Sequence, residues 1–279
     1  MVPVLRRGAH GPDVELLQRR LAEAGFRPGR VDGSFGPATE AALAAFQRSR
    51  GLLADGLAGP VAWHALAGRG TGAPADLSGQ VTVGLVAEMF PSTLVRTIER
   101  HLPAVLGGLR GMGLVDKPML LMALATIRVE SEGFEPVEER LSRFNTSPDG
   151  HPFDLYDHRR DLGNLGPPDG HRYRGRGFVQ LTGRHNYLRH GEALGLGRHL
   201  AHHPNRALDP ALAGRLLAAF LAERRRPIKE ALLDGDLARA RRLVNGGRHG
   251  LDRFVSAYRI GDALLKDEVW RADATPQPA

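Results

Sequence analysis

The sequence predicts a mainly α-helical protein in two parts, a small three-helix module followed by a larger all-helical domain. Apolar residues recur every three or four positions along most of the chain, and no stretch alternates in polarity for more than a few residues. Gly, Pro, Ser and Thr interrupt the pattern at 68–79. The 279 residues, 42% hydrophobic and 25% charged, suit two globular domains. We expect the module at 1–68, a linker at 69–84, the domain at 85–270 and a disordered tail at 271–279.

Three helices are expected in the module, and each begins at a proline. The first lies between Pro12 and Gly25, where apolar residues follow one another at three and four positions. The second begins at Pro37 and the third at Pro60. Proline is favourable at the first helical position because its missing N–H would have no partner there. So small a module favours binding over catalysis.

An internal repeat connects these helices. Asp-Gly turns begin at Asp32 and at Asp55, 23 residues apart, and each leads into a Gly-Pro pair that starts the next helix. Asp32, Phe35, Asp55 and Trp63 are the candidate ligand-binding residues of the module. For Phe35 and Trp63, packing in the core is the competing interpretation.

Composition excludes several classes of chemistry and of partner. Because the chain has no cysteine, disulfides, thiolate zinc sites and a thiol nucleophile are excluded. A net charge of +7 suits an anionic polymer such as cell-wall material, although arginine-rich coding bias would produce the same charge. Only 6% of residues are aromatic, which gives little support to a stacking groove for nucleic acid. No apolar run approaches the roughly 18 residues of a membrane span.

Helical spacing also dominates the second part of the chain. Residues 142–180, rich in Asn, Pro, Gly and Asp, form a long connection of the kind that is usually functional or disordered. The arginines within 224–226 and 239–242 are expected on solvated faces or at helix C-termini. The helices expected here are 92–106, 117–129, 210–223, 236–244 and 252–265.

Glu130 follows a stretch, 119–129, that is apolar on nearly every side. Such a pattern predicts a helix that is buried all round. A carboxyl group at the end of a buried helix is desolvated, which disfavours its charged form and prepares it to donate a proton. A salt bridge to Arg128 or to another arginine is the competing interpretation.

Two further carboxylates, Glu138 and Glu139, come shortly after. In a continuous helix, nine residues would separate Glu130 from Glu139 by about 13 Å. Gly133 and Pro136 interrupt the helix, so the two carboxylates can face each other. Inverting glycoside hydrolysis requires two carboxyl groups roughly 6.5–9.5 Å apart, one to protonate the leaving oxygen and one to activate water.

Residues 173–187 read Tyr-Arg-Gly-Arg-Gly-Phe-Val-Gln-Leu-Thr-Gly-Arg-His-Asn-Tyr. The glycines allow close backbone approach, and the short polar side chains suit sugar hydroxyls. The segment lacks the preceding strand and the glycine spacing of a nucleotide-binding loop. Its candidate sugar contacts are Gln180, Thr182, Asn186 and Tyr187.

The module resembles the peptidoglycan-binding domain of bacterial wall-active enzymes. The resemblance rests on Leu-Arg-Arg-Gly at 5–8, Val-Asp-Gly-Ser-Phe-Gly-Pro-Ala-Thr at 31–39 and Ala-Phe-Gln-Arg-Ser-Arg-Gly-Leu at 45–52. It covers the module from end to end. The resemblance implies that peptidoglycan is the partner of this protein.

Residues 85–265 resemble the catalytic domain of glycoside hydrolase family 19, which contains chitinases and phage endolysins. The motifs are Val-Glu-Ser-Glu-Gly-Phe at 129–134, the segment 173–187 and Val-Asn-Gly-Gly at 244–247. The resemblance implies a lysozyme-like, all-helical fold and a general acid at Glu130. The substrate-binding residues that it implies are Gln180, Thr182 and Asn186. It also implies that Asn245 helps to place the substrate or the water. Tyr187 and Arg176, which belong to the 173–187 motif, are further candidate substrate contacts.

The general base is less firmly assigned by the resemblance. In endolysin-like members a carboxylate nine residues after the acid is the base, which is Glu139 here, with Glu138 beside it. In plant-type members the base lies farther along, on a loop where this chain has Asp149, Asp154 and Asp157.

Two positions depart from the family pattern. Val129 stands where the family has histidine, and Arg140 stands where it has asparagine. These departures concern the base and the substrate preference rather than the fold. Val129 also motivates the hypothesis of a wall-binding protein whose hydrolase domain has lost its activity.

We therefore expect an inverting glycosidase that cleaves β-1,4 bonds beside N-acetylated sugars in peptidoglycan, with chitin oligomers as the alternative substrate. Neither cofactor nor metal is expected, because the histidines at 199, 202 and 203 lack a metalloprotease pattern. We expect a monomer made without a signal peptide. Holin-type release, export by a secretion system or cell lysis would then deliver it to the wall.

Overall fold

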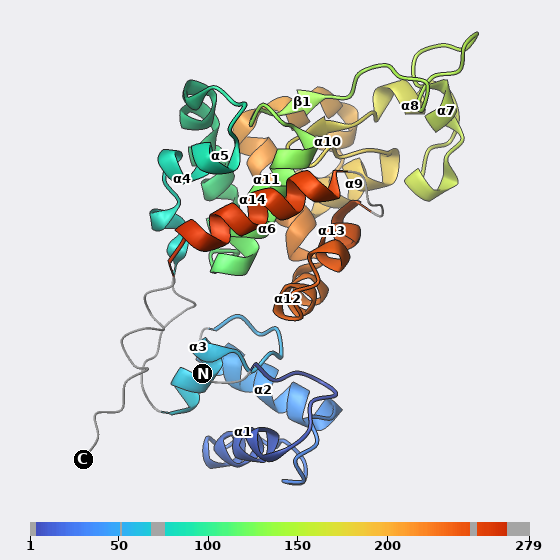
Figure 1. The fold of residues 1–279 in the computed structure, drawn as a ribbon. Coiled ribbons are helices and arrows are strands. Elements are labelled where there is room, and N and C mark those ends of the chain that lie inside the picture. The colour runs from blue at the N-terminus through green and yellow to red at the C-terminus, as the bar shows by residue number, and fades with distance from the viewer. Residues whose placement is uncertain (1–3, 51, 68–75, 246–249, 267–279) are drawn as a thin grey trace. The chain divides into compact units, whose positions relative to one another are not determined.

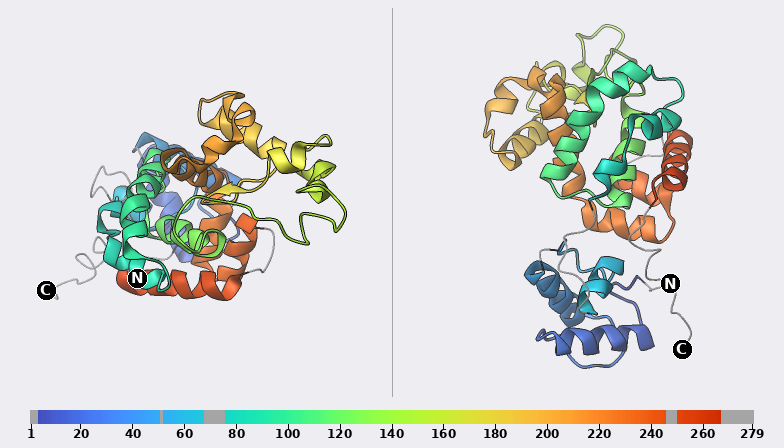
Figure 2. Two further views of the ribbon diagram at one scale, coloured as in Figure 1. Left: turned by 90° about the horizontal axis from the view of Figure 1, so that it is seen from above. Right: turned by 90° about the vertical axis from the view of Figure 1, so that its left-hand side faces the viewer.

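The computed structural model describes residues 4–50, 52–67, 76–245 and 250–266, and the predicted mainly α-helical fold is confirmed (Figures 1 and 2). The described chain forms two compact units, one that ends at Leu77 and one from Ser78 to Lys266. We call them the module and the larger unit. The predicted tail at 271–279 lies outside the described residues.

The three predicted helices of the module are confirmed, and each begins at its proline. They are α1 (Pro12–Glu23), α2 (Pro37–Ser49) and α3 (Pro60–Leu66). Their apolar faces meet in a core around Leu17, Leu43 and Phe46. Phe35 belongs to this core at 1% exposure, and Trp63 packs partly buried against it. Core packing therefore accounts for both aromatic residues.

Each Asp-Gly turn of the repeat is held by a buried glutamine of the preceding helix. Gln18 donates to Asp32 Oδ1 at 3.1 Å and accepts from the Gly33 amide at 3.0 Å. Gln47 donates to Asp55 Oδ1 at 2.9 Å and accepts from the Gly56 amide in the same way. Asp32 and Asp55, which the sequence analysis gave as candidate ligand-binding residues, therefore hold the turns in shape.

Among the described residues of the larger unit, the regular elements are helices apart from one short pair of strands. The elements that follow α3 are η1 (Leu77–Gln80), which begins at the last described residue of the module, α4 (Val83–Met89), α5 (Val95–Gly111), α6 (Lys117–Glu130), β1 (Val137–Glu138), α7 (Asp154–Asp157), η2 (Arg160–Leu162) and α8 (Asp169–Arg172). These are followed by β2 (Arg176–Gly177), α9 (Arg184–Ala193), α10 (His199–His202), η3 (Pro204–Leu208), α11 (Pro210–Ala222), α12 (Arg225–Leu233), α13 (Leu237–Asn245) and α14 (Leu251–Leu264).

Helix α6 is the buried centre of this unit, as its all-apolar sequence predicts. Every residue from Met119 to Ile127 is fully buried. Helices α4, α11, α12 and α14 pack against it (Figure 1). Helices α5 and α11 approach each other through backbone, since a Cβ on Gly108 would lie 2.2 Å from the Gly214 carbonyl oxygen. A helix surrounded in this way gives the carboxylate at its end a fixed position.

Three predictions about the elements were wrong. The end of the predicted linker is structured, because Leu77 and Val81 are buried and α4 begins at Val83. Arg225 and Arg226 begin α12, a helix that the prediction missed, whereas Arg224 follows the end of α11 and donates to the Phe220 carbonyl at 3.2 Å, as a helix C-terminal charge. The helix expected at 92–106 begins later and continues to Gly111.

The chain turns back after α6 and pairs with a distant segment. Phe134, at a left-handed φ of 55°, is fully buried and packs edge-on against Phe90 with ring centroids 4.9 Å apart. Strand β1 then pairs antiparallel with β2, Glu138 opposite Arg176. The pairing of β1 with β2 connects the segment that follows Glu130 to the segment 173–187.

Candidate active site

Glu130 is the last residue of α6 and forms an ion pair with Arg241 of α13. Arg241 Nη2 donates to Glu130 Oε1 at 2.7 Å. The arginine is fully buried, and the glutamate side chain is 16% exposed. Arg128, the partner considered from the sequence, instead contacts Glu132 at 2.9 Å. The predicted salt bridge therefore exists, but with an arginine 111 residues away.

The assignment of Arg241 to a solvated face or a helix C-terminus was wrong. Within α13, Leu237, Ala240, Arg241 and Val244 follow the spacing of one helix face, so Arg241 points inward with the apolar residues. This spacing was the available signal. A buried guanidinium needs a carboxylate partner, because an unpaired buried charge is costly. Glu130 supplies that partner, and the contact fixes the position of the carboxyl group.

Val129, which stands where the family that the sequence resembles has histidine, has a packing role. A Cβ on Gly250 would lie only 2.3 Å from Val129 Cγ1. Gly250 precedes α14 with a left-handed φ of 68°. Valine therefore fills the space where the end of α6 meets the start of α14, and this departure leaves Glu130 in place.

Glu139 follows β1 and is held by three neutral donors. Its Oε1 accepts from Asn145 Nδ2 at 3.0 Å and from the Tyr156 hydroxyl at 2.8 Å. Its Oε2 accepts from the Gly175 amide at 3.0 Å. Such a set of donors suits an ionised carboxylate, the form that a general base needs. Burial and the neighbouring carboxylate raise the pKa of Tyr156 far above its ordinary value, so its hydroxyl remains a donor.

Gly175 is the point at which three predicted site residues meet. A Cβ built on this glycine would lie 2.7 Å from Gln180 Oε1 and 3.1 Å from both Glu139 Oε2 and Thr182 Oγ1. The absence of a side chain here therefore allows the carboxylate, the amide and the hydroxyl to approach one another. The structure thus brings the 139 region and the 173–187 segment together.

Gln180 and Thr182 are also fixed by hydrogen bonds. Gln180 has a left-handed φ of 51° and donates from Nε2 to the Val137 carbonyl at 2.9 Å. Thr182 donates to the Gln180 carbonyl at 2.8 Å, and Asn186 Nδ2 donates to the Thr182 carbonyl at 2.7 Å. All three side chains are partly exposed, so they combine fixed positions with access to solvent.

Tyr187 and Arg176, predicted as substrate contacts, lie in the interior instead. Tyr187 is fully buried and Arg176 is 1% exposed. Arg176 Nη1 donates to the Tyr187 hydroxyl at 3.1 Å, and that hydroxyl donates to the Arg174 carbonyl at 3.0 Å. Burial raises the pKa of Tyr187 to about 12. Neither side chain is exposed enough to contact a sugar, and both stabilise the 173–187 segment from the interior of the protein.

Glu138, the neighbouring alternative for the base, is engaged by two arginines. Arg174 Nη2 lies 2.7 Å and Arg176 Nε 2.8 Å from Glu138 Oε1. Burial acts to raise the pKa of Glu138, but the hydrogen bonds and charges of both arginines outweigh it, so the pKa lies below its ordinary value. This carboxylate joins β1 to β2.

Of the more distant aspartates, two stabilise the loop that contains them. Asp154 accepts from the Ser147 amide at 2.8 Å and from its hydroxyl. Asp157 is almost fully buried and accepts from the Gly170 amide at 2.8 Å. Asp149 is exposed on the same loop. Asp154 and Asp157 are thus engaged within their own loop, whereas Glu139 connects its loop to the 173–187 segment.

Asn245 is the last residue of α13, and its side chain lies outside what the structure describes. It follows Arg241 by four residues, about one helical turn. Sequence reasoning also missed Asn145 and Tyr156, the two side chains that hold Glu139. Both lie in the connection 142–180, whose content of Asn, Pro, Gly and Asp had indicated a functional or disordered loop without naming its members.

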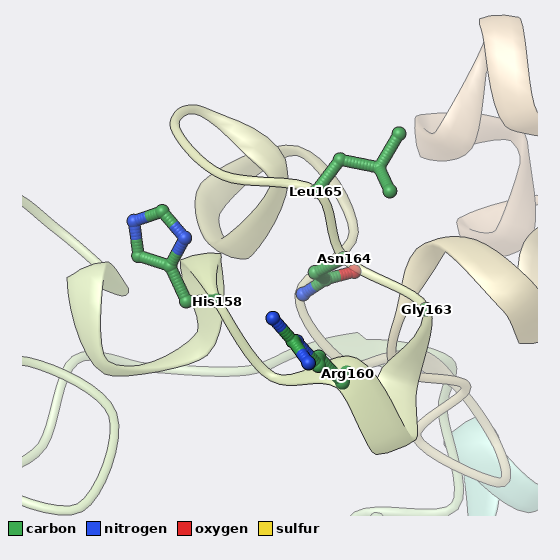
Figure 3. Close-up of a pocket in the computed structure, with 5 residues that line it drawn as sticks. All are labelled: His158, Arg160, Gly163, Asn164 and Leu165. Atoms are coloured by element: carbon green, nitrogen blue, oxygen red, sulfur yellow. The ribbon is translucent and has the colours of Figure 1, made fainter.

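A hollow of about 480 Å³ lies on the same loop, lined by His158, Arg160, Gly163, Asn164 and Leu165 (Figure 3). Asn164 Nδ2 donates to the Tyr156 carbonyl at 2.8 Å, which links the hollow to the residue that contacts Glu139. Within the described part of the chain, no group of three His, Asp or Glu residues is placed to hold a metal ion. Nor does any described helix have the length and apolar character needed to cross a bilayer.

Residues 10–66 match the family model for a peptidoglycan binding domain. The spore cortex-lytic enzyme of Bacillus cereus is 55% identical over 56 residues, which are 20% of this chain and 22% of that protein. An N-acetylmuramoyl-L-alanine amidase of Mycobacterium tuberculosis is 53% identical over 51 residues, 18% of this chain and 13% of that protein. The chain therefore spans less than a quarter of the length of these relatives.

Solved structures resemble a larger share of the chain. Chitinase C from Streptomyces griseus has 19% identity and a TM-score of 0.45, with 68% of this chain and 77% of that chain covered. The endolysin of Burkholderia phage AP3 has 24% identity and a TM-score of 0.28, with 94% of this chain and 99% of that chain covered.

Proposed function

We propose that this protein is a peptidoglycan glycosidase that cleaves a β-1,4 bond beside an N-acetylated sugar with inversion. The observation that carries the proposal is the meeting of Glu139, Gln180 and Thr182 around Gly175. A carboxylate held by neutral donors next to an amide and a hydroxyl suits a sugar ring and an attacking water. The same chain carries, at 10–66, the match to a peptidoglycan binding domain.

In the proposed reaction, Glu130 protonates the glycosidic oxygen as the bond to the anomeric carbon breaks. Glu139 takes a proton from a water molecule, whose oxygen attacks that carbon from the opposite side of the ring. Arg241 balances the negative charge that Glu130 acquires when it gives up its proton. Gln180, Thr182, Asn186 and Asn245 contact the substrate, and the module keeps the enzyme on the wall.

Hydrolysis of purified murein sacculi by the full chain tests this proposal. Turbidity should fall while new reducing ends accumulate, because a glycosidase exposes one reducing sugar for each bond cleaved. Free amino groups should not increase, because a glycosidase breaks no amide bond. This measurement matters because one of the relatives named above is an amidase, which would release amino groups. Turnover of a soluble chitin oligomer, with sacculi left intact, would instead identify a chitinase and overturn the proposal.

A further inference from the structure

Two exposed arginines lie on the loop that positions Glu139. Arg140 directly follows the carboxylate in sequence, and Arg143 comes three residues later. Neither guanidinium is paired with a carboxylate in the part of the chain that the structure describes, and both side chains are exposed. They differ in this from Arg174 and Arg176, which are engaged by Glu138.

The loop from 140 to 145 is tied to Glu139 through one buried asparagine. Asn145 Nδ2 donates both to Glu139 Oε1 at 3.0 Å and to the Arg140 carbonyl at 2.9 Å. Asn145 Oδ1 accepts from the Ser142 amide at 2.8 Å. Four residues of chain span at most about 14 Å, and this turn shortens the span, so both arginines start close to the carboxylate.

The surface of this loop combines positive charge with exposed apolar groups. The Arg143 guanidinium lies 4.9 Å from the centre of the Phe144 ring, which is itself 74% exposed. Leu141, between the two arginines, is 59% exposed. A guanidinium over a ring keeps its N–H donors available for a carboxylate. The loop therefore suits an anionic chain with apolar side groups.

We propose that Arg140 and Arg143 bind the carboxylates of a peptidoglycan stem peptide beside the bond that is cleaved. This inference rests on the proposed function. It names the residues that would recognise the peptide carboxylates, which distinguish peptidoglycan from chitin. Both polymers are β-1,4-linked and contain N-acetylated sugars, but only peptidoglycan carries peptides with free carboxylates. Charge complementarity at the loop thus selects a peptide-bearing glycan over a bare one.

The test compares three full-length proteins on two forms of the same glycan. They are the parent, Arg140→Gln/Arg143→Gln, and the control Arg198→Gln/Arg206→Gln, which removes two other exposed arginines of the larger unit. The substrates are soluble murein strands with their stem peptides and the same strands after an amidase has removed them. Thermal unfolding of each variant checks that the fold is intact.

The parent should have a higher kcat/KM on peptide-bearing strands than on bare strands. In Arg140→Gln/Arg143→Gln the ratio of the two values should fall about tenfold, the size expected from two exposed ion pairs. The control should keep the parent ratio. Raising the salt concentration should lower the parent ratio, because exposed ion pairs are screened.

An unchanged ratio in Arg140→Gln/Arg143→Gln, or an equal fall in the control, would overturn the inference while leaving the proposed function intact. If the parent cleaves neither murein substrate but does cleave a chitin oligomer, the proposed function fails and the inference fails with it. The two failures are therefore distinguishable in one experiment.

Discussion

Glu130 and Glu139 belong to the same unit, yet they are held in opposite ways. Glu130 lies at the end of a buried helix and is paired with a buried arginine 111 residues away. Glu139 lies after a short strand and accepts hydrogen bonds from Asn145, Tyr156 and the Gly175 amide. One buried charge fixes the position of the first carboxylate, whereas three neutral donors fix the position of the second. The two positions should therefore respond differently to the loss of a partner.

Removing the carboxyl proton of Glu130 should have the largest effect on catalysis. Glu130→Gln should lower kcat on sacculi by about 10³-fold or more, within the range for loss of a general acid. Binding to sacculi should remain, because the module is unchanged. A substrate with an activated leaving group needs no proton, so its cleavage should be far less affected. Lysis at the parent rate would contradict the role of Glu130.

The corresponding change at the base should respond differently to the leaving group. Glu139→Gln should lower kcat by about 10²-fold to 10³-fold, because the attacking water loses its proton acceptor. An activated leaving group should not restore the rate, since this step still requires the base. Restoration in Glu139→Gln but not in Glu130→Gln would reverse the two assignments.

Breaking the buried ion pair should affect stability more than any change at Glu139. Arg241→Met leaves Glu130 without its buried partner and should lower the free energy of unfolding by about 3–5 kcal/mol. The neighbouring Arg242 is exposed, so Arg242→Met is a matched control that should stay within about 0.5 kcal/mol of the parent. Urea unfolding of both variants measures the difference, and equal stabilities would contradict the structural role of Arg241.

Removing one of the neutral donors should have a smaller effect. Tyr156→Phe deletes the 2.8 Å hydrogen bond to Glu139 Oε1 but keeps the ring. One such bond contributes about 0.5–1.5 kcal/mol to the free energy of unfolding, and a loss of similar size in positioning Glu139 would lower kcat roughly threefold to tenfold. A variant as inactive as Glu139→Gln would show that the hydroxyl takes part directly in the reaction.

The smallest effect is expected at Glu138 and should depend on pH. Its pKa is lowered from 4.5, because Arg174 and Arg176 outweigh the effect of burial. A lowered pKa stabilises the fold above the unfolded value, and this stability is lost as the pH falls through the folded value. The melting temperature of Glu138→Gln should therefore lie below that of the parent at neutral pH and approach it in acid. A difference that persists below both pKa values would contradict the ion-pair interpretation.

What could be predicted from sequence was local. Pro12, Pro37 and Pro60 marked three helix starts, and the apolar run at 119–129 predicted a helix buried on every side. Gly133 and Pro136 predicted that the helix ends soon after Glu130. Each of these features depends on a few residues that are neighbours in sequence, and the structure confirms them.

The rest depended on contacts between distant segments. Arg241 shares an apolar helix face, but only the folded chain shows that α13 places it against Glu130. Tyr187 looked like a sugar contact because its motif is rich in polar groups, yet its side chain turns inward toward Arg176. Gln18 and Gln47 were passed over because nothing in their helices connects them to the turns that they hold. The spacing of apolar residues predicts which face of a helix is buried. It does not predict which distant segment packs against that face.

The anomeric configuration of the first product tests the paired-carboxylate account most directly. NMR spectra recorded in the first minutes of murein hydrolysis, before mutarotation, distinguish the two anomers of the new reducing sugar. Inversion at a β-1,4 bond by Glu130 and Glu139 predicts the α-anomer first. Early appearance of the β-anomer would show retention, and would contradict a mechanism in which Glu139 activates water.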